Sequence, residues 1–159
     1  MRIRLAAVGR MKQGPERELC TRYLDRAIAT GKPLALTGFE VVELPESRAG
    51  SAARRKAEEA EALRAAVAEG PLVCLDEGGK SLSSQAFAEH LRAWRDDGRA
   101  AVSFIIGGAD GLAPDLIAAA DLTLSFSRLT WPHQLVRIML AEQLYRTTTI
   151  IAGHPYHRE

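Results

Sequence analysis

The chain has 159 residues, of which 47% are hydrophobic and 26% are charged, and its formal net charge is +1. This length fits one domain with a sizeable core, so we expect a single domain over residues 1–159. A net charge near zero gives no overall field that attracts nucleic acid, so RNA contacts would depend on local basic clusters. No apolar run reaches the roughly 20 residues that span a bilayer, and the N-terminus lacks a signal-peptide pattern, which predicts a cytoplasmic protein without a membrane segment.

Strand and helix patterns alternate along the whole chain. We expect strands at 1–9, 39–45, 71–76, 101–108 and 122–127, and helices at 16–29, 51–70, 83–98, 114–120 and 132–148. In the second helix, Ser51 is the expected N-cap and Gly70 the expected stop. The alternation predicts an α/β fold with a mostly parallel sheet and helices on both faces. Residues 46–53 are the best candidate for a mobile loop near a substrate.

The two cysteines carry little functional signal. Cys20 falls in a helical pattern and Cys74 in an apolar strand, and neither has a second cysteine or a histidine at metal-ligand spacing. We expect both to be reduced packing residues, and we expect no metal site.

Two glycine-containing segments follow expected strands. The segment GGADG, residues 107–111, could let a ligand approach the backbone closely, because Gly107 and Gly108 have no Cβ. It lacks the Rossmann spacing, and a tight structural turn explains such a loop equally well. The segment GGKS, residues 78–81, suggests a phosphate loop, but Cys74 stands where that motif needs a glycine. We therefore exclude an NTPase.

A second unusual loop, SFSRLTWPH, opens the last expected helix at residues 125–133. Helix capping by Thr130 accounts for one hydroxyl, which leaves Ser125 and Ser127 free to contact an adenosine or a carboxylate. In open α/β sheets, ligands bind beyond the carboxyl ends of the strands. This loop and the segment at residues 107–111, which we call the glycine loop, both fall there. His133 and Arg137 stand one helical turn apart, a pair that is more often solvated or at the edge of a core than part of a site.

The chain end and the last helix each suggest a role. The tail HPYHRE concentrates groups that stack, donate hydrogen bonds and carry charge, although a disordered end is an equally good interpretation. The helix carries more apolar positions than a helix covered on one side needs, so we expect its surplus face to form a dimer interface. The residues behind this expectation are Leu135, Ile138, Met139, Ala141, Glu142 and Tyr145.

Four motifs in order, LDEGGK, FIIGGADGL, LSFSRLTWPHQLVRIMLAEQLYR and HPYHRE, closely resemble the ribosomal RNA large subunit methyltransferase H family, and the likeness covers nearly the whole chain. The resemblance implies a SPOUT-class enzyme with a C-terminal trefoil knot that works as a homodimer. It implies S-adenosyl-L-methionine as cofactor and methylation of N3 of a pseudouridine in a stem-loop of 23S rRNA, in the large subunit or the ribosome. The near-zero net charge favours the assembled ribosome over naked RNA.

The resemblance also assigns roles to residues. The family's cofactor pocket falls on Leu75, Gly107, Gly108, Ser127, Arg128, Leu129, Thr130, Trp131 and Pro132. The family tail falls on Tyr156, His157 and Arg158, and in a dimer one protomer's tail could reach the other's cofactor. The N3 proton must leave, and the candidates to assist are His157, His133, Arg158 and Arg137. The arginines could equally bind phosphate, and Trp131 replaces smaller apolar residues common in the family.

Two other functional hypotheses also fit the α/β pattern. A ribosome-associated module could recognise RNA shape without catalysis, and a flavodoxin-type protein could bind an adenine nucleotide or a flavin. The first would bind RNA without any cofactor. The second would need a phosphate loop, which the chain does not offer, and neither explains the tail.

Overall fold

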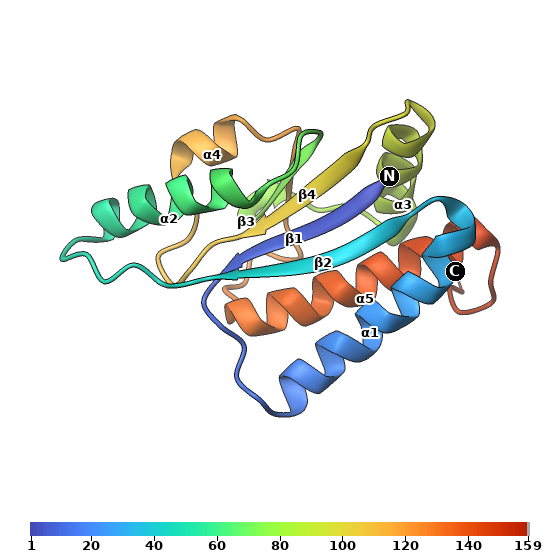
Figure 1. Ribbon diagram of the computed structural model, residues 1–159, viewed down its shortest axis with the longest axis horizontal. Helices are drawn as coiled ribbons and strands as arrows, with labels where there is room; N and C mark the ends of the chain where they lie inside the picture. Colours follow the sequence, from blue (N-terminus) through green and yellow to red (C-terminus); the bar gives the residue numbers. More distant parts are fainter. Residues whose placement is uncertain (159) are drawn as a thin grey trace.

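A computed structural model describes residues 1–158, so Glu159, the last residue of the tail motif, lies outside the described residues. Its sheet has five strands in the order β2-β1-β4-β3-β5, and every neighbouring pair is parallel (Figure 1). The elements are β1 (Arg2–Val8), α1 (Pro15–Gly31), the 3-10 helix η1 (Lys32–Leu34), β2 (Thr37–Leu44), α2 (Ala52–Ala66), β3 (Leu72–Lys80), α3 (Ser84–Asp96), β4 (Ala101–Ile106), α4 (Pro114–Ala118), β5 (Leu122–Leu124) and α5 (His133–Ala152).

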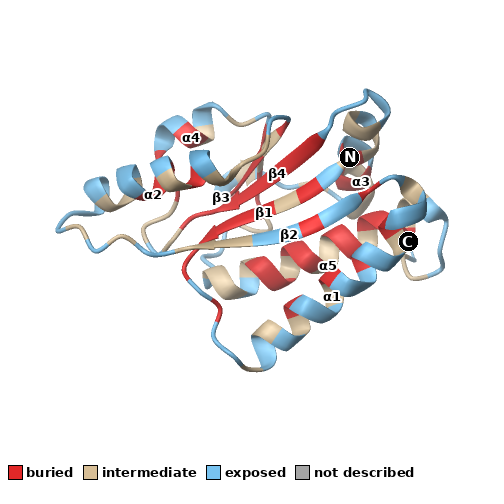
Figure 2. Cartoon of the chain, in the orientation of Figure 1, coloured by how far each residue is buried: buried red, intermediate tan, exposed pale blue. Residues whose placement is uncertain are grey.

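Helices cover both faces of the sheet, as the alternation predicted. Because successive side chains of a strand point to opposite faces, Ile3 and Leu5 of β1 join one core cluster while Ala6 and Val8 join the other. The first cluster includes residues of α1, α3 and α5, and the second includes residues of α2 and α4. All six residues of β4 are buried, which explains its continuous apolar run (Figure 2). The predicted α/β class is confirmed.

Strand β3 is longer than predicted. It continues to Lys80, and Leu124 of β5 is paired with both Leu75 and Lys80, so residues 76–79 form a bulge. A Cβ on Gly79 would lie 2.7 Å from the backbone of Thr123. This glycine of the GGKS segment is thus required by packing against β5.

Strand β5 is shorter than predicted and ends at Leu124. The chain leaves the sheet at Ser125, whose single hydroxyl hydrogen is shared between the carbonyl oxygens of Ser127, at 2.8 Å, and Glu77, at 3.2 Å. These bonds turn the chain away from the strand direction. Residues 125–132 therefore form a loop at the carboxyl edge of the sheet.

Helix ends were predicted with mixed success. Ser51 caps α2 as expected, since its Oγ accepts a hydrogen bond from Arg54 N, but the helix ends at Ala66 and not at Gly70. Thr130 does not cap α5, because Pro132 is the N-cap residue and no side chain caps this helix. Thr130 Oγ1 instead donates a hydrogen bond to Glu77 Oε2 at 3.3 Å. The expectation that Thr130 caps the last helix was wrong.

Cys20 and Cys74 are free and buried, in agreement with the packing role expected for them. Among the described residues, none of the helices combines the length and the apolar character that crossing a bilayer requires. The trefoil knot stays a prediction, because strand order does not define how the chain threads.

Candidate functional site

A cavity of about 580 Å³ opens at the carboxyl edge of the sheet, beyond the ends of β3, β4 and β5. This volume and position are typical of small-molecule sites in α/β proteins. Its lining comes from Lys56 of α2, from Leu75, Asp76 and Glu77 of β3, from Ile106 and the glycine loop, from Pro114 and Ile117 of α4, from residues 124–127 and 129–131, and from His133 and Val136 of α5.

Most of the residues that the sequence assigned to a cofactor pocket line this one cavity. They are Leu75, Gly107, Gly108, Ser127, Leu129, Thr130 and Trp131. Arg128 and Pro132 belong to the same loop but do not line the cavity. Two loops separated by α4 and β5 in the sequence therefore meet at one site.

The glycine loop packs closely against neighbouring protein atoms at Gly107 and Gly108. A Cβ on Gly107 would lie 2.7 Å from the carbonyl carbon of Gly111, and one on Gly108 would lie 3.0 Å from both Glu59 Oε2 and Val8 Cγ1. A side chain at Gly107 would force the backbone to move, and one at Gly108 would require the side chains of Glu59 and Val8 to shift. The two glycines therefore let the loop stay packed on the sheet while its backbone borders the cavity.

Hydrogen bonds within the loop fix the segment 125–131. Ser127 Oγ accepts hydrogen bonds from Leu129 N at 2.8 Å and from the Trp131 indole Nε1 at 3.3 Å. The Ser125 hydroxyl is buried and bonded to carbonyl groups. Both serines therefore shape the loop, where the sequence suggested hydroxyls free for a ligand.

Charged side chains from three segments line the cavity. Asp76 and Glu77 lie in the bulge of β3, and Lys56 reaches it from α2. Asp110 is held by Arg55 through a forked ion pair, with Nε to Oδ2 at 2.6 Å and Nη2 to Oδ1 at 3.0 Å. The hydrogen bonds from Arg55 lower the pKa of Asp110 below its usual value, and the charge of Lys56 contributes.

Sequence reasoning missed these charged lining residues. Lys56 sits in a helix whose charge pattern is typical of a solvated face, so nothing local indicated a site. Asp76 and Glu77 directly follow the apolar run of β3, and that position at a strand end was an available signal.

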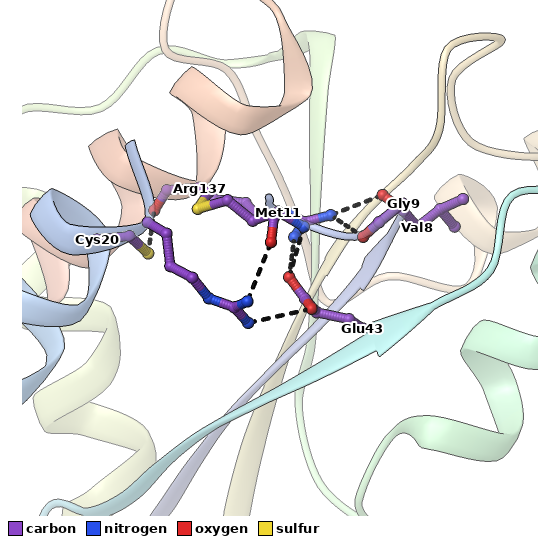
Figure 3. Close-up of polar contacts among 7 residues, drawn as sticks. Val8, Gly9, Met11, Cys20, Glu43 and Arg137 are labelled. Carbon is purple, nitrogen blue, oxygen red and sulfur yellow. Dashed lines mark hydrogen bonds and ion pairs between the residues drawn. The ribbon is translucent and has the colours of Figure 1, made fainter. Parts of the chain in front are cut away.

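Arg137, a predicted candidate for substrate contact, is buried with only 2% of its surface exposed. Its Nη1 donates to Glu43 Oε1 at 2.9 Å, and its Nη2 donates to the carbonyl oxygens of Val8 at 2.7 Å and Gly9 at 2.5 Å (Figure 3). Burial lowers its pKa, and the Glu43 carboxylate opposes that effect. The guanidinium faces protein groups, so in place of a substrate contact the structure gives Arg137 a clamping role between α5, β2 and the end of β1.

His133, one turn before Arg137, does line the cavity. Its Nε2 would lie 3.3 Å from a Cβ placed on Gly9, whose φ is +86°. The imidazole therefore sits between the cavity and the end of β1. Among the histidines predicted as candidates, it is the one that the described chain brings to the cavity.

The tail residues lie elsewhere in the same chain. The Tyr156 ring packs against the Tyr145 ring with 4.6 Å between centroids and an angle of 51° between the ring planes, and its hydroxyl donates to Glu142 Oε1 at 3.1 Å. Arg146 lies over the Tyr156 ring, and its Nη1 is 3.4 Å from His157 Nδ1. Burial raises the pKa of Tyr156 to about 12, with Glu142 adding to the shift.

The tail and the cavity contact different parts of α5. The cavity touches its first turn, whereas Tyr156 contacts Glu142, about 14 Å further along the helix axis at 1.5 Å per residue. In Figure 1 the C-terminus lies beside the far end of α5. Tyr156, His157 and Arg158 therefore do not line the cavity of their own chain.

Helix α5 leaves less apolar surface exposed for a dimer interface than the sequence predicted. Ile138, Ala141 and Tyr145 are buried in the core cluster that α5 shares with α1 and α3, so they cannot serve an interface. Leu135 remains 38% exposed near the cavity, together with Leu129 at 67% and Trp131 at 40%. This exposed apolar group lies at the start of α5 and in the loop before it.

The cavity combines apolar walls with the acidic residues Asp76, Glu77 and Asp110 and with one lysine, Lys56. Such an arrangement can bind a molecule that carries a flat apolar part, hydroxyl groups and charges of both signs. Among residues 1–158, no three His, Cys, Asp or Glu side chains gather as a metal ion would require.

Comparisons with known proteins agree with this architecture. A family model described as "Predicted SPOUT methyltransferase" matches residues 1–157. A relative from Bradyrhizobium sp. (strain ORS 278), named Ribosomal RNA large subunit methyltransferase H, is 54% identical over 99% of this chain and 98% of its own length. A relative of the same name from Nitrobacter winogradskyi is 56% identical over 99% of both chains. A probable methyltransferase from Bordetella pertussis Tohama I shares the fold, with a TM-score of 0.54 at 15% identity over 92% of this chain and 95% of its own.

Proposed function

Because the chain belongs to the SPOUT methyltransferase family, we propose that it transfers a methyl group from S-adenosyl-L-methionine to N3 of a pseudouridine in a stem-loop of 23S rRNA. The names of its full-length relatives support the large ribosomal subunit as the source of the RNA. The substrate is the large subunit or the assembled ribosome, and the enzyme works in the cytoplasm, where ribosomes are found.

The observation that carries the proposal is the meeting of the glycine loop and the segment 125–131 at one cavity. Leu75 and Ile106 offer apolar surfaces for an adenine ring, and the Asp76 and Glu77 carboxylates can accept hydrogen bonds from ribose hydroxyls. The residues present therefore fit S-adenosyl-L-methionine, which when bound supplies a methyl group already activated by its sulfonium.

The task of the protein is chiefly to position the base, because displacement at an activated methyl group needs close approach and alignment. The N3 atom must also lose its proton. His133 borders the cavity and is the candidate within the same chain. His157 and Arg158 are candidates from the tail, and Arg137 supports the site from behind through its bonds to Glu43 and to the end of β1.

A homodimer would bring the tail to a cavity. Within one chain, Tyr156 and His157 lie against the second half of α5, away from the cavity. Leu129, Trp131 and Leu135 expose apolar surface beside the cavity, where a second copy can pack. In that arrangement the tail of one copy completes the site of the other.

The test is methylation of ribosomes from a strain that lacks this activity. The purified protein, labelled S-adenosyl-L-methionine and either large subunits or assembled ribosomes are incubated, and the label is located by mass spectrometry of rRNA fragments. We expect label on N3 of one 23S pseudouridine, and we expect Tyr156→Ala and His157→Ala to abolish it while the fold is kept. Binding of ribosomes without label and without cofactor affinity would instead support the non-catalytic RNA-binding module.

A further inference from the structure

Lys56 provides the one lysine or arginine side chain among the described residues that line the cavity. It lies in the first half of α2 and is half-buried. Within residues 1–158, its ammonium group has no hydrogen bond or ion pair. A lysine bordering a cavity without a partner holds a positive charge available to a ligand.

None of the carboxylates near Lys56 bonds its ammonium group among the described residues. Asp110, the acidic residue of the glycine loop, is held by Arg55 Nε and Nη2, so both of its carboxylate oxygens already accept hydrogen bonds from another side chain. Glu59, one turn further along α2, accepts a hydrogen bond from Ser47 N at 3.0 Å and packs against Gly108. The acidic pair Asp76 and Glu77 belongs to the β3 side of the cavity.

Asp76 and Glu77 thus line the cavity from β3, whereas Lys56 lines it from α2, beside the Arg55–Asp110 ion pair. S-adenosyl-L-methionine has ribose hydroxyls and an ammonium that suit carboxylates, and a single negative group, its carboxylate. From this charge distribution we infer that Lys56 binds the carboxylate of the methionine part of the cofactor beside the glycine loop. The inference rests on the proposed function and adds a residue that fixes which way the cofactor lies.

The experiment compares two ligands that differ in the carboxylate alone. Binding of S-adenosyl-L-methionine and of its decarboxylated form is measured by calorimetry for the wild-type protein, Lys56→Met and Lys56→Arg. We expect the wild type to prefer the carboxylate form by about tenfold, which is typical of a hydrogen bond between charged groups. In Lys56→Met this preference should disappear, while affinity for the decarboxylated form is unchanged, and Lys56→Arg should keep most of it.

Lys80→Met is the matched control, because Lys80 lies on β3 outside the cavity lining. It should keep the full preference, and thermal unfolding of each variant confirms that the fold is intact. A wild type that binds both ligands equally, or a Lys56→Met variant that keeps the preference, overturns the role of Lys56 and leaves the methyltransferase proposal standing. A wild type that binds neither ligand overturns both.

Discussion

At the scale of single residues, the buried Arg137 clamp is the most consequential contact. Its guanidinium joins α5 to Glu43 of β2 and to the last carbonyl groups of β1, and Glu43 Oε1 also accepts a hydrogen bond from Met11 N at 2.8 Å (Figure 3). The clamp thus fixes the start of α5, where His133 borders the cavity. Removing Arg137 would leave the more distant Arg17, at 3.4 Å, as the ion-pair partner of Glu43, and it would take one donor from the carbonyl groups of Val8 and Gly9.

We therefore predict that Arg137→Met lowers the free energy of unfolding by roughly 3 kcal/mol, as measured by urea denaturation. Arg4→Met is the control, because the Arg4–Glu40 pair lies on the surface and exposed pairs contribute less than about 1 kcal/mol. Equal effects of the two substitutions would contradict the clamping role. Arg137→Lys should fall between them, because lysine keeps the charge but loses the planar fork.

The pair His133 and Arg137 shows which structural feature the spacing of residues in a helix does not predict. The spacing of His133 and Arg137 placed them on one face of a helix, and both do lie toward the end of β1. Only packing separates them: His133 borders the cavity, whereas Arg137 is enclosed. Helical periodicity predicts which side of the helix a residue faces. It does not predict how completely other elements cover that residue.

At the scale of elements, the end of α5 determines where the tail goes. Gly153 ends the helix in the left-handed conformation with φ of +67°, and the turn is closed by His154 N donating to the Thr149 carbonyl at 2.9 Å. This reversal returns Tyr156 to the surface of α5, against Tyr145. A residue with a Cβ is strained in that conformation.

Gly153→Ala should destabilise the protein by about 1 kcal/mol in chemical denaturation, because alanine adopts the left-handed conformation poorly. A Cβ at Gly153 meets no atom within 4 Å, so strain and not a clash is the cause. Gly50→Ala is the control, since Gly50 also has open space but no positive φ. Equal losses of unfolding free energy in Gly153→Ala and Gly50→Ala would contradict the role of backbone strain at Gly153.

Elements were predicted well where they are long and periodic, and less well where they end. The helical patterns behind α1, α3 and α5 were found because each presents a continuous apolar face. The bulge that lengthens β3 and the early end of β5 were missed, because both depend on the bond from Ser125 N to the Lys80 carbonyl at 2.9 Å, between residues distant in sequence.

At the scale of the whole molecule, the exposed apolar group beside the cavity is the proposed contact with a second copy. Leu135 is 38% exposed on the first turn of α5. We predict that Leu135→Glu weakens self-association at least tenfold in analytical ultracentrifugation, because a charge would be buried at the interface, and that it also reduces methylation.

Ile28→Glu provides the matched comparison, since Ile28 is 44% exposed on α1, outside this apolar group. It should leave the association state and the activity unchanged. A wild-type protein that is monomeric at micromolar concentration in light scattering would count against both the dimer and the shared site. Loss of association in both variants would show that the interface is not restricted to the start of α5.

The sequence by itself determined the alternating order of strands and helices, the helices on both faces and the two loops that reach the cavity, because periodicity and turn chemistry act over a few neighbouring residues. Tertiary structure decided the strand order β2-β1-β4-β3-β5, which sets the ends of β3, β4 and β5 side by side. It also brought Lys56 to the cavity, enclosed Arg137 and kept Tyr156 away. These outcomes depend on contacts between distant segments, and local patterns of hydrophobicity do not specify which segments meet.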